Sequence, residues 1–404
     1  MASVQLTRRD FLKAMAIGAG ALTVGPLLQA CAPAAPSGGT PLKIGVVLPY
    51  SKVYAQLGDS ITKGMQLYFD SVNNMAGGRP ITLIKEDEEN DPQVALTKTR
   101  KLIEQDKVDL FTGVVATPVV YALRDLLDST KTISLISNAG GNDLTRKRKS
   151  PYIFRTSFTS WQVASPLGPW VYQNVAKSVM IVAADYGFGH ESADAFKETF
   201  TKAGGTIVGE LYPPFPSTDF GAFLPKIAAA KPPAIYSFFS GSDAVNFIKQ
   251  FADYGLGKDI QITGSGFLVE QDVLPAEGMA ANGAYSTLHW ALTLDNAENK
   301  KFVADYKTKF NATADVFALQ GYDTARVIVE ALNAVKGDTS NKDNLLQAIR
   351  AVKFNSPRGP FVFDQTTQNV NQYIYYRQVR DAGGGQLQNA VLGKTDQPVV
   401  DPGA

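Results

Sequence analysis

The stretch Lys43-Ile44-Gly45-Val46-Val47-Leu48 is a run of almost continuous apolar residues. Such a run is typical of a strand that is buried on both faces, as the strands of parallel sheets are. The residues that follow, from Gly58 to Val72, repeat apolar side chains with the spacing of an amphipathic helix. A buried strand followed by such a helix predicts one unit of a parallel sheet that is covered by helices.

This strand–helix unit recurs along the chain. The first series continues with predicted strands at Ile81–Ile84, Val108–Val115 and Ile133–Ile136 and predicted helices at Pro92–Gln105 and Pro118–Leu127. A second series has predicted helices at Trp161–Val175, Ser192–Ala203, Phe220–Ala230 and Asp243–Tyr254, and predicted strands at Ser178–Ala183, Thr206–Leu211, Ala234–Phe239 and Ile260–Thr263. The alternation predicts an α/β fold with two Rossmann-like lobes, each built from right-handed βαβ units around a parallel sheet.

The part of the chain after Gly283 is too small to form a third lobe. It contains a predicted strand, helices near Ala297–Phe310, Phe317–Val335 and Asp343–Val352, and a terminal strand pair, Phe361–Phe363 and Tyr373–Val379. We expect the helices to complete lobe 1 (residues 41–157 and 286–358) and the last strands to return to lobe 2 (residues 158–285 and 359–395), before a tail at 396–404. The chain then crosses between the lobes three times, near Thr156–Thr159, Tyr285–Thr287 and Arg358–Pro360, and leaves a ligand cleft between them.

The N-terminal residues predict export from the cytoplasm. The pair Arg8-Arg9 precedes a short apolar run and resembles a twin-arginine signal, and that run is too short for a permanent membrane span. Cys31, the single cysteine, stands where a bacterial lipobox places its lipidated residue. We therefore expect a signal at 1–31, a flexible linker at 32–40 and a body in the periplasm or at the outer face of the cytoplasmic membrane. The alternative is that Cys31 is an incidental residue of a leader that is removed.

Composition excludes several kinds of partner and site. A net charge of +1 disfavours nucleic acid and anionic membrane surfaces, and the basic run Arg146–Lys149 lacks interleaved aromatic residues, so we expect a solvated turn there. Because no cysteine follows Cys31, the body has no disulfide and no thiolate metal site. We expect neither a metal nor a cofactor.

The order of several short segments carries a family resemblance. The body resembles a type I periplasmic binding protein of the branched-chain amino acid class, the receptor subunit of an ABC importer. The matching segments are Lys43–Pro49, Phe111–Thr117, Leu135–Ala139, Phe154–Thr156 and Asp185–Gly189. The resemblance implies two lobes that close on a small molecule and a membrane permease as partner.

In an open α/β sheet, ligands bind beyond the carboxyl ends of the strands. This rule selects Pro49–Tyr54, Ala116–Thr117, Ser137–Gly141 and Asp185–Phe188, with Ser240–Ser242 and Ser265–Phe267 in the second lobe. We expect Thr117 to cap the helix that begins at Pro118, where a hydroxyl and free N–H groups favour an anion. In the family that this chain resembles, the matching segment receives the carboxylate of the ligand, and the position of Tyr186 closes on the ligand from the second lobe.

One departure from the family pattern bears on the ligand. Amino-acid binders of this kind place an acid near the position of Phe267, but here no carboxylate precedes Glu270. A buried ammonium group needs a charged or strongly polar partner, whereas aromatic walls suit an aromatic acid. An amino acid or amide remains the alternative if Glu270, Asp243 or Asp323 turns inward. The predicted ligand-binding residues are Tyr54, Ala116, Thr117, Ala139, Gly140, Gly141, Trp161, Tyr186, Phe239, Phe267 and Tyr322; each can instead be an ordinary cap, turn or packing residue.

Other functional classes have weaker support. The chain has no Gly-x-Ser-x-Gly elbow, no Walker lysine loop and no HExxH pair, and its two histidines, His190 and His289, are far apart in sequence. We therefore expect that the protein is not an enzyme. An exported cofactor-dependent oxidoreductase is the alternative from another class, because twin-arginine signals often carry such enzymes. A ligand sensor would share the same lobes and differ only in its partner.

Overall fold

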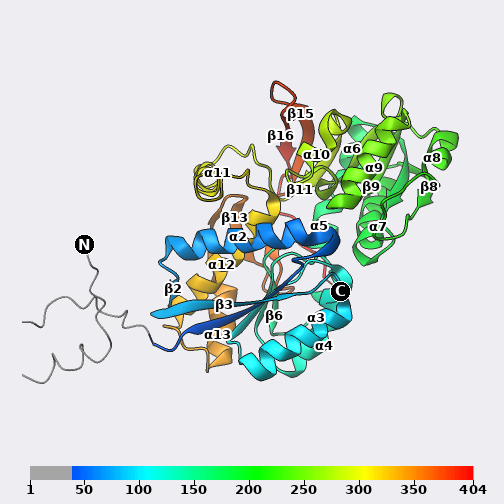
Figure 1. Ribbon diagram of the computed structural model, residues 1–404. Helices are drawn as coiled ribbons and strands as arrows, with labels where there is room; N and C mark the ends of the chain where they lie inside the picture. Colours follow the sequence, from blue (N-terminus) through cyan, green and yellow to red (C-terminus); the bar gives the residue numbers. More distant parts are fainter. Residues whose placement is uncertain (1–38, 404) are drawn as a thin grey trace, which may run out of the picture. The chain divides into compact units, whose positions relative to one another are not determined.

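The computed structural model describes residues 39–403 (Figure 1). The predicted export signal, Cys31 and all but the last two residues of the predicted linker lie outside the described residues. Within the described part, no helix is both long enough and apolar enough to cross a membrane. The described part contains two lobes, each with its own β-sheet, and the predicted α/β fold class is confirmed.

The first lobe contains a six-stranded sheet in the order β2-β3-β1-β4-β5-β6, with the apolar run quoted above as β1 near its centre. The strands are β1 (Leu42–Leu48), β2 (Met75–Ala76), β3 (Arg79–Asp87), β4 (Leu110–Gly113), β5 (Ser134–Ile136) and β6 (Ile153–Arg155). β1 runs parallel to both β3 and β4. Ile44 and Val46 face one core cluster and Val47 faces the other, and all three are fully buried.

Helices cover both faces of this sheet. They are α2 (Ala55–Ser71), α3 (Pro92–Lys101), α4 (Thr117–Ser129), α11 (Ala297–Phe310), α12 (Val316–Ala334) and α13 (Lys342–Ala351). α2 and α12 lie side by side on one face, and α3 and α4 pack on the other (Figure 1). The first pair is in close contact because glycines meet there: a Cβ atom on Gly64 would lie 1.8 Å from the carbonyl oxygen of Ala318. The C-terminal helices thus complete the first lobe.

The second lobe contains a seven-stranded sheet in the order β16-β15-β11-β10-β9-β7-β8. Its strands are β7 (Ser178–Ala183), β8 (Thr206–Leu211), β9 (Ala234–Phe238), β10 (Gln261–Ser265), β11 (Tyr285–Leu288), β15 (Tyr375–Asp381) and β16 (Leu387–Lys394). Its helices are α5 (Ser160–Ala164), α6 (Leu167–Asn174), α7 (Gly187–Lys202), α8 (Leu224–Ala230), α9 (Ser242–Asp253) and α10 (Leu274–Glu277). The five strands from β7 to β11 are parallel, and β15 and β16 add an antiparallel edge.

Two of the three crossings differ from the predicted positions. The first lies between β6 and α5, which agrees with the predicted stretch Thr156–Thr159. The second follows Leu288, not Tyr285–Thr287, because β11 pairs with β10 and β15 in the second sheet. The predicted lobe boundary at residue 286 therefore cut through a strand of the second lobe.

The third crossing lies between β14 and β15, not at Arg358–Pro360. A separate three-stranded sheet, β12 (Lys353–Ser356), β13 (Gly359–Phe363) and β14 (Val370–Asn371), stays with the first lobe, where Asn369 bridges to Arg155 of β6. The predicted terminal strand pair is wrong for the same reason: β13 pairs with β12 and β14, and β15 pairs with β11 and β16. An apolar pattern reveals a strand but does not identify its partner.

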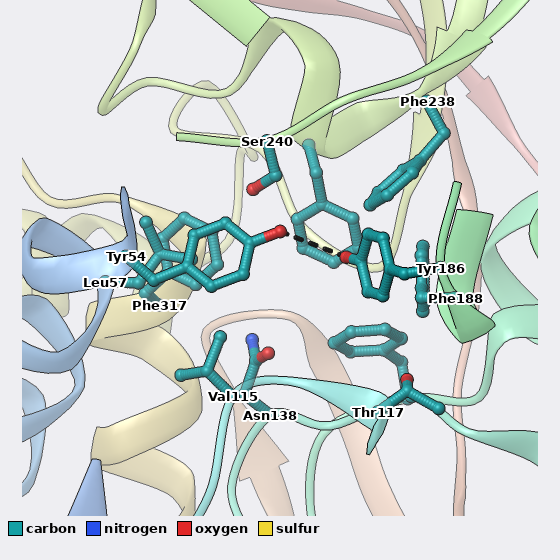
Figure 2. Close-up of a pocket in the computed structure, with 13 residues that line it drawn as sticks. Tyr54, Leu57, Val115, Thr117, Asn138, Tyr186, Phe188, Phe238, Ser240 and Phe317 are labelled. Carbon is teal, nitrogen blue, oxygen red and sulfur yellow. Dashed lines mark hydrogen bonds between the residues drawn. The ribbon is translucent and has the colours of Figure 1, made fainter. Parts of the chain in front are cut away.

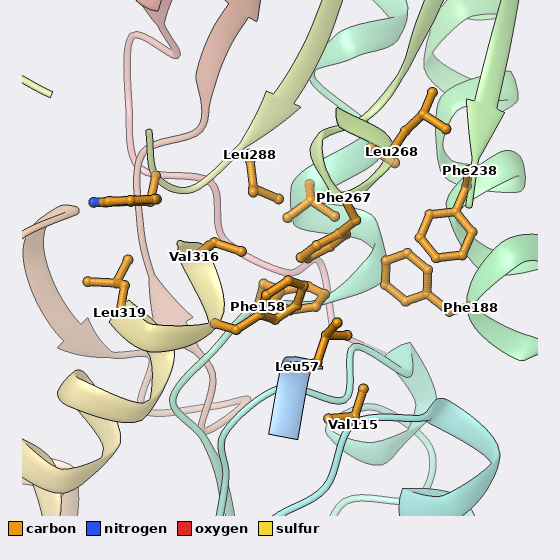
Figure 3. Packing of buried hydrophobic residues seen from close by; sticks show 14 of the residues in the cluster. Leu57, Val115, Phe158, Phe188, Phe238, Phe267, Leu268, Leu288, Val316 and Leu319 are labelled. Atoms are coloured by element: carbon orange, nitrogen blue, oxygen red, sulfur yellow. The ribbon is translucent and has the colours of Figure 1, made fainter. Parts of the chain in front are cut away.

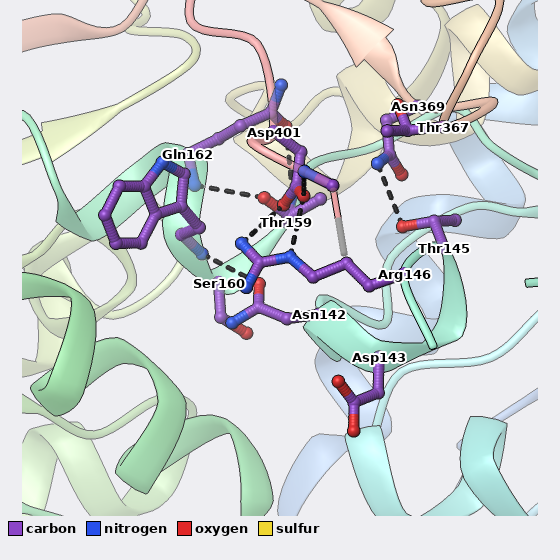
Figure 4. A network of polar contacts seen from close by, with 12 residues as sticks. Asn142, Asp143, Thr145, Arg146, Thr159, Ser160, Gln162, Thr367, Asn369 and Asp401 are labelled. Atoms are coloured by element: carbon purple, nitrogen blue, oxygen red, sulfur yellow. Dashed lines mark hydrogen bonds and ion pairs between the residues drawn. The ribbon is translucent and has the colours of Figure 1, made fainter. Parts of the chain in front are cut away.

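The end of the chain packs back onto Arg146 and Gln162, which lie before and after the first crossing in sequence (Figure 4). The Nε atom of Arg146 donates to Oδ1 of Asp401 at 2.7 Å, and the Gln162 amide donates to the carbonyl of Val399 at 2.7 Å. Asp401 is buried. The expectation of a solvated turn at Arg146–Lys149 is therefore wrong for Arg146.

Two buried ion pairs hold the crossings together. Arg358 donates through Nε to Asp323 of α12 at 2.8 Å and also to the carbonyl groups of Thr156 and Ser157 in the first crossing. Arg377 of β15 donates to Glu270 at 2.8 Å. Both arginines are almost completely inaccessible to solvent. We call these pairs and the three crossings the hinge.

Candidate ligand pocket between the lobes

A narrow pocket lies between the lobes (Figure 2). Its free volume of about 20 Å³ has room for little more than one water molecule, so a larger ligand requires the lobes to separate. The first lobe contributes Tyr54, Leu57, Val115, Thr117, Asn138, Gly140, Phe158 and Phe317. The second lobe contributes Tyr186, Phe188, Phe238, Ser240 and Phe267.

Aromatic rings form most of the wall (Figure 3). Phe158 and Phe267 have ring centroids 4.9 Å apart, and Phe188 and Phe238 have centroids 4.5 Å apart. Phe317 extends this wall from α12, 5.8 Å from Phe267. The first two pairs are tilted and the third is stacked, which are ordinary geometries for packed aromatic rings.

Thr117 lies where the first turns of two helices from opposite lobes meet. It is the first residue of α4, and a Cβ atom on Gly187, the first residue of α7, would lie 3.2 Å from its methyl carbon. The predicted capping role is wrong, because Ala116 is the N-cap and no side-chain cap bond forms. The Thr117 hydroxyl is instead buried with no partner among the described residues. Helix starts and a free hydroxyl together favour a negatively charged group.

The loop after β5 presents further backbone donors, and Arg155 sets their direction. The buried Arg155 guanidinium donates to the carbonyl oxygens of Gly140 and Gly141 at 3.0 and 2.6 Å. In a trans peptide the carbonyl and the following N–H point in opposite directions, so the N–H of Gly141 faces away from Arg155. Gly140 must be glycine here, because a Cβ atom would lie 2.6 Å from the ring of Phe188.

Two tyrosines meet across the pocket. The hydroxyls of Tyr54, from the turn before α2, and Tyr186, the N-cap of α7, are 3.0 Å apart. Burial raises the pKa of both phenols above the ordinary value, so both keep their protons. Figure 2 shows the Ser240 hydroxyl on the side of the pocket opposite to Thr117 and Asn138.

A chain of amides orients Asn138 at the pocket floor. Its Nδ2 atom donates to Oε1 of Gln320 at 2.7 Å, and the Gln320 amide lies 3.3 Å from Nε2 of His289. Burial and the nearby arginines hold the pKa of His289 well below its usual range, so this histidine is neutral. The Oδ1 atom of Asn138 remains available as a hydrogen-bond acceptor.

No charged side chain lines the pocket in the described part of the chain. Glu270 and Asp323, two of the acids that an amino-acid ligand would require, are instead paired with the hinge arginines. The third, Asp243, lies in the first turn of α9, where its carboxylate accepts a hydrogen bond from the N–H of Ser217 at 2.8 Å. Burial raises the pKa of Asp243 to about 6.

A further contact joins the lobes beside the pocket. Glu191 of α7 accepts hydrogen bonds from the Tyr121 hydroxyl of α4 at 2.6 Å and from the N–H of Asn142 at 2.7 Å. All three groups lie outside the pocket lining. This contact and the tyrosine pair connect the second lobe to two of the first-lobe helices that border the pocket, α2 and α4.

Five predicted residues line the pocket: Tyr54, Thr117, Gly140, Tyr186 and Phe267. Six do not. Ala116 and Ala139 are buried in the second core cluster of the first lobe, and Gly141 lies against Tyr121 and the methyl group of Thr117. Trp161 packs near Arg146, Phe239 against Phe220 and Phe247, and Tyr322 against Tyr68 and Phe302.

Eight lining residues were not predicted individually: Leu57, Val115, Asn138, Phe158, Phe188, Phe238, Ser240 and Phe317. Asn138, Phe188 and Ser240 lie within the strand-end stretches that the sequence selects, so the strand-end rule identified their segments. Phe238 is the last residue of β9 and directly precedes Phe239; successive side chains point to opposite sides, and Phe238 is the one that faces the pocket. Leu57 and Phe317 come from helices, for which the strand-end rule has no signal.

Comparison with known proteins gives a consistent picture. A family model described as periplasmic binding protein matches residues 41–385. A curated relative from Brucella melitensis, named Leu/Ile/Val-binding protein homolog 6, is 29% identical over 367 residues, which cover 90% of this chain and 93% of that protein.

Two solved structures are also similar. The solute-binding protein of an ABC transporter from R. palustris, in complex with benzoate, is 36% identical, with a TM-score of 0.85 and coverage of 89% of this chain and 98% of that one. A solute-binding protein from Rhodopseudomonas palustris BisB5, in complex with 3,4-dihydroxybenzoic acid, is 34% identical, with a TM-score of 0.85 and coverage of 90% and 99%.

Proposed function

The chain belongs to the periplasmic binding protein family, and we propose that it is the receptor of an ABC importer for a small aromatic carboxylate. The observation that carries the ligand class is the buried, unpartnered Thr117 hydroxyl at the start of α4, in a pocket with aromatic walls. The carboxylate would accept hydrogen bonds from Thr117 and from backbone N–H groups of α4, α7 and the Gly140–Gly141 loop. The ring would lie among the phenylalanines of the wall.

Three features support this ligand over an amino acid. The pocket lining of the described residues has no acid to neutralise an ammonium group, which is costly to bury unpaired. The buried Arg155, which forms no salt bridge within residues 39–403, adds positive charge behind the Gly140–Gly141 loop. Two relatives with similar structures were crystallised with benzoate and a dihydroxybenzoate.

A branched-chain amino acid is the second candidate, because the curated Brucella relative is named for leucine, isoleucine and valine. Isothermal titration calorimetry on residues 39–404 with benzoate, benzamide and L-leucine separates the candidates. We expect benzoate to bind at least tenfold more tightly than benzamide, since an ionised acceptor makes the stronger hydrogen bonds. Tight binding of leucine without binding of benzoate would refute the aromatic ligand.

The remaining parts of the function follow from the family and from the N-terminal sequence. We propose that the protein works outside the cytoplasm, is exported through a twin-arginine signal, is anchored by lipid at Cys31 and delivers its ligand to a membrane permease. Mass spectrometry of the mature protein tests the anchor: a chain that starts well after Cys31 and carries no lipid would refute it. Loss of ligand uptake on deletion of the gene distinguishes transport from sensing.

A further inference from the structure

The end of the chain connects the two lobes at a place separate from the three crossings. Strand β16 ends at Lys394 in the second lobe, and Asp401 pairs with Arg146, which lies between β5 and β6 of the first lobe (Figure 4). We call residues 395–401 the strap. Its two anchors, one on each lobe, determine what the strap does when the lobes move.

The first anchor is Val399, which is fixed to the second lobe. Its N–H donates to the carbonyl of Gln372 in the third crossing at 2.7 Å, and its carbonyl accepts from the Gln162 amide of α5 at 2.7 Å. The next residue of α5, Val163, accepts a hydrogen bond from the Thr287 hydroxyl of β11 at 2.7 Å. Because α5 is thus bonded to the second sheet, Val399 moves with the second lobe.

The second anchor is Asp401, which is fixed to the first lobe. Both of its carboxylate oxygens accept from Arg146, Oδ1 from Nε at 2.7 Å and Oδ2 from Nη2 at 3.0 Å. A carboxylate held at both oxygens by one guanidinium is among the stronger polar contacts of proteins. Thr145, next to Arg146, accepts a hydrogen bond from Asn369 at 2.9 Å, and Asn369 is bridged to β6. Arg146 therefore moves with the first lobe.

The strap has no slack between these anchors. Only Val400 separates Val399 from Asp401, and a chain extends by at most about 3.3–3.6 Å per residue, so the two anchors can be no more than about 7 Å apart. Val400 is 47% exposed, so the link is held mainly at its ends. The closed pocket has room for little more than one water molecule, so a ligand enters only after the lobes separate.

We propose that the strap opposes separation of the lobes, and that the pair between Arg146 and Asp401 is the anchor that breaks when they separate. Water can replace this pair, because the Arg146 side chain is 18% exposed, whereas Gln162 at the other anchor is fully buried. A contact that is made only in the closed form lowers the population of the open form. This device goes beyond the proposed function and does not depend on the identity of the ligand.

The rate at which a thiol inside the pocket is alkylated measures how often the pocket opens. No cysteine follows Cys31, so Val115→Cys places a single thiol in the pocket lining of residues 39–404. Iodoacetamide is too large for the closed pocket and reacts with this thiol only in the open form. In this background and without ligand, Asp401→Asn removes the charge of the second anchor and should raise the alkylation rate about tenfold.

Insertion of three glycines after Val400 is the sharper test, because it retains both anchors and adds up to about 10 Å of chain. A strap that acts through its length predicts a similar rise in the alkylation rate, whereas a merely structural role of the ion pair predicts none. Glu330→Gln is the matched control. It removes the pair of Glu330 with Arg326 within α12, which has the same N–O distance of 2.7 Å but does not join the lobes.

The outcomes are distinct. If Asp401→Asn and the insertion alkylate no faster than Glu330→Gln, the proposal is overturned. If Asp401→Asn alkylates faster but the insertion does not, the ion pair acts on the stability of the fold and not through the strap, which also overturns the proposal. Thermal melting identifies a variant that does not fold, and the insertion at the exposed Val400 then carries the test. Failure of the wild type to bind benzoate would refute the proposed function but would leave the alkylation result valid.

Discussion

The pocket and the hinge are both buried between the lobes, but they differ in whether their polar groups have hydrogen-bond partners within the protein. In the hinge, Arg358 pairs with Asp323 and Arg377 pairs with Glu270, and each arginine makes further bonds to backbone carbonyls. In the pocket, the hydroxyl group of Thr117 has no partner among the described residues. A buried polar group is costly when unpaired, so a fold retains one where a ligand completes its bonds. The hinge carboxylates thus have arginine partners within the protein, whereas the Thr117 hydroxyl is left for a ligand.

The largest expected effect comes from breaking a hinge ion pair. Arg358→Met leaves Asp323 buried without its cation and removes the bonds to the first crossing. Breaking a buried pair typically costs about 3–5 kcal/mol, so the free energy of unfolding from urea denaturation should fall by that amount. Arg100→Met is the control, because Arg100 and Glu104 form an exposed pair on α3 that should contribute less than about 1 kcal/mol. Equal effects of the two changes would remove the distinction between hinge and surface pairs.

Glu88 is a carboxyl group beside the pocket that lacks the cation of the hinge carboxyls. It accepts a hydrogen bond from the N–H of Val115 at 3.3 Å, and burial raises its pKa from 4.5 to about 8. The folded state therefore favours the protonated form. Its contribution to stability is fully present below pH 4.5 and is lost as pH rises towards 8.

As the pH rises from 5 to 8, we expect the unfolding free energy of the wild type to fall by a few kcal/mol relative to that of Glu88→Gln. Urea denaturation at several pH values measures it, and comparison with the variant cancels the contribution of other buried carboxyls such as Asp243. A constant difference would mean that Glu88 is ionised in the fold.

Removal of an unpaired pocket hydroxyl should affect binding more than folding. Thr117→Val deletes a donor to the carboxylate and should weaken benzoate binding by about 1.5–3 kcal/mol, or roughly tenfold to a hundredfold, in calorimetry. The free energy of unfolding without ligand should not fall, since no protein bond is lost. Thr117→Ser retains the hydroxyl and should keep most of the affinity. If Thr117→Val instead lowered the free energy of unfolding and left the affinity unchanged, the hydroxyl would have a structural role and not a ligand-binding one.

The smallest effect is expected at the contact between Glu191 and Tyr121. As in the hinge, these two groups are hydrogen-bonded to each other, but they join the lobes near the pocket. Tyr121→Phe removes one hydrogen bond across the lobes and should weaken ligand binding by about 1 kcal/mol, mainly through faster dissociation. Tyr212→Phe is the matched control, because its hydroxyl donates to Glu210 within the second lobe at 2.9 Å. Stopped-flow fluorescence measures both dissociation rates, and equal rates would show that the contact does not stabilise the closed form.

Much of the pocket can be located from local sequence signals. The ends of parallel strands converge at one edge of a sheet, so the loops that contain Thr117, Gly140, Tyr186 and Phe267 were selected by position alone. The family resemblance is also confirmed, because the periplasmic binding protein family model matches residues 41–385. The absence of an acid before Glu270 can be read directly from the residues.

The errors share one cause. Trp161, Phe239 and Tyr322 are aromatic residues close in sequence to pocket segments, yet they pack against other side chains. Phe317 and Leu57 line the pocket from helices, to which the strand-end rule does not apply. The direction of each side chain depends on which elements pack against it, and those elements are far away in sequence.

The sequence by itself determined the α/β class, the family and the segments that border the pocket, because apolar runs, helical periodicity and strand ends are local properties. Only the tertiary structure decided where the chain crosses between lobes, since β11 and β13 join their sheets through partners distant in sequence. It likewise decided that Glu270 and Asp323 pair with Arg377 and Arg358 while the Thr117 hydroxyl stays unpaired. Partner choice among buried polar groups is a long-range property, because burial brings together residues that the chain order keeps apart.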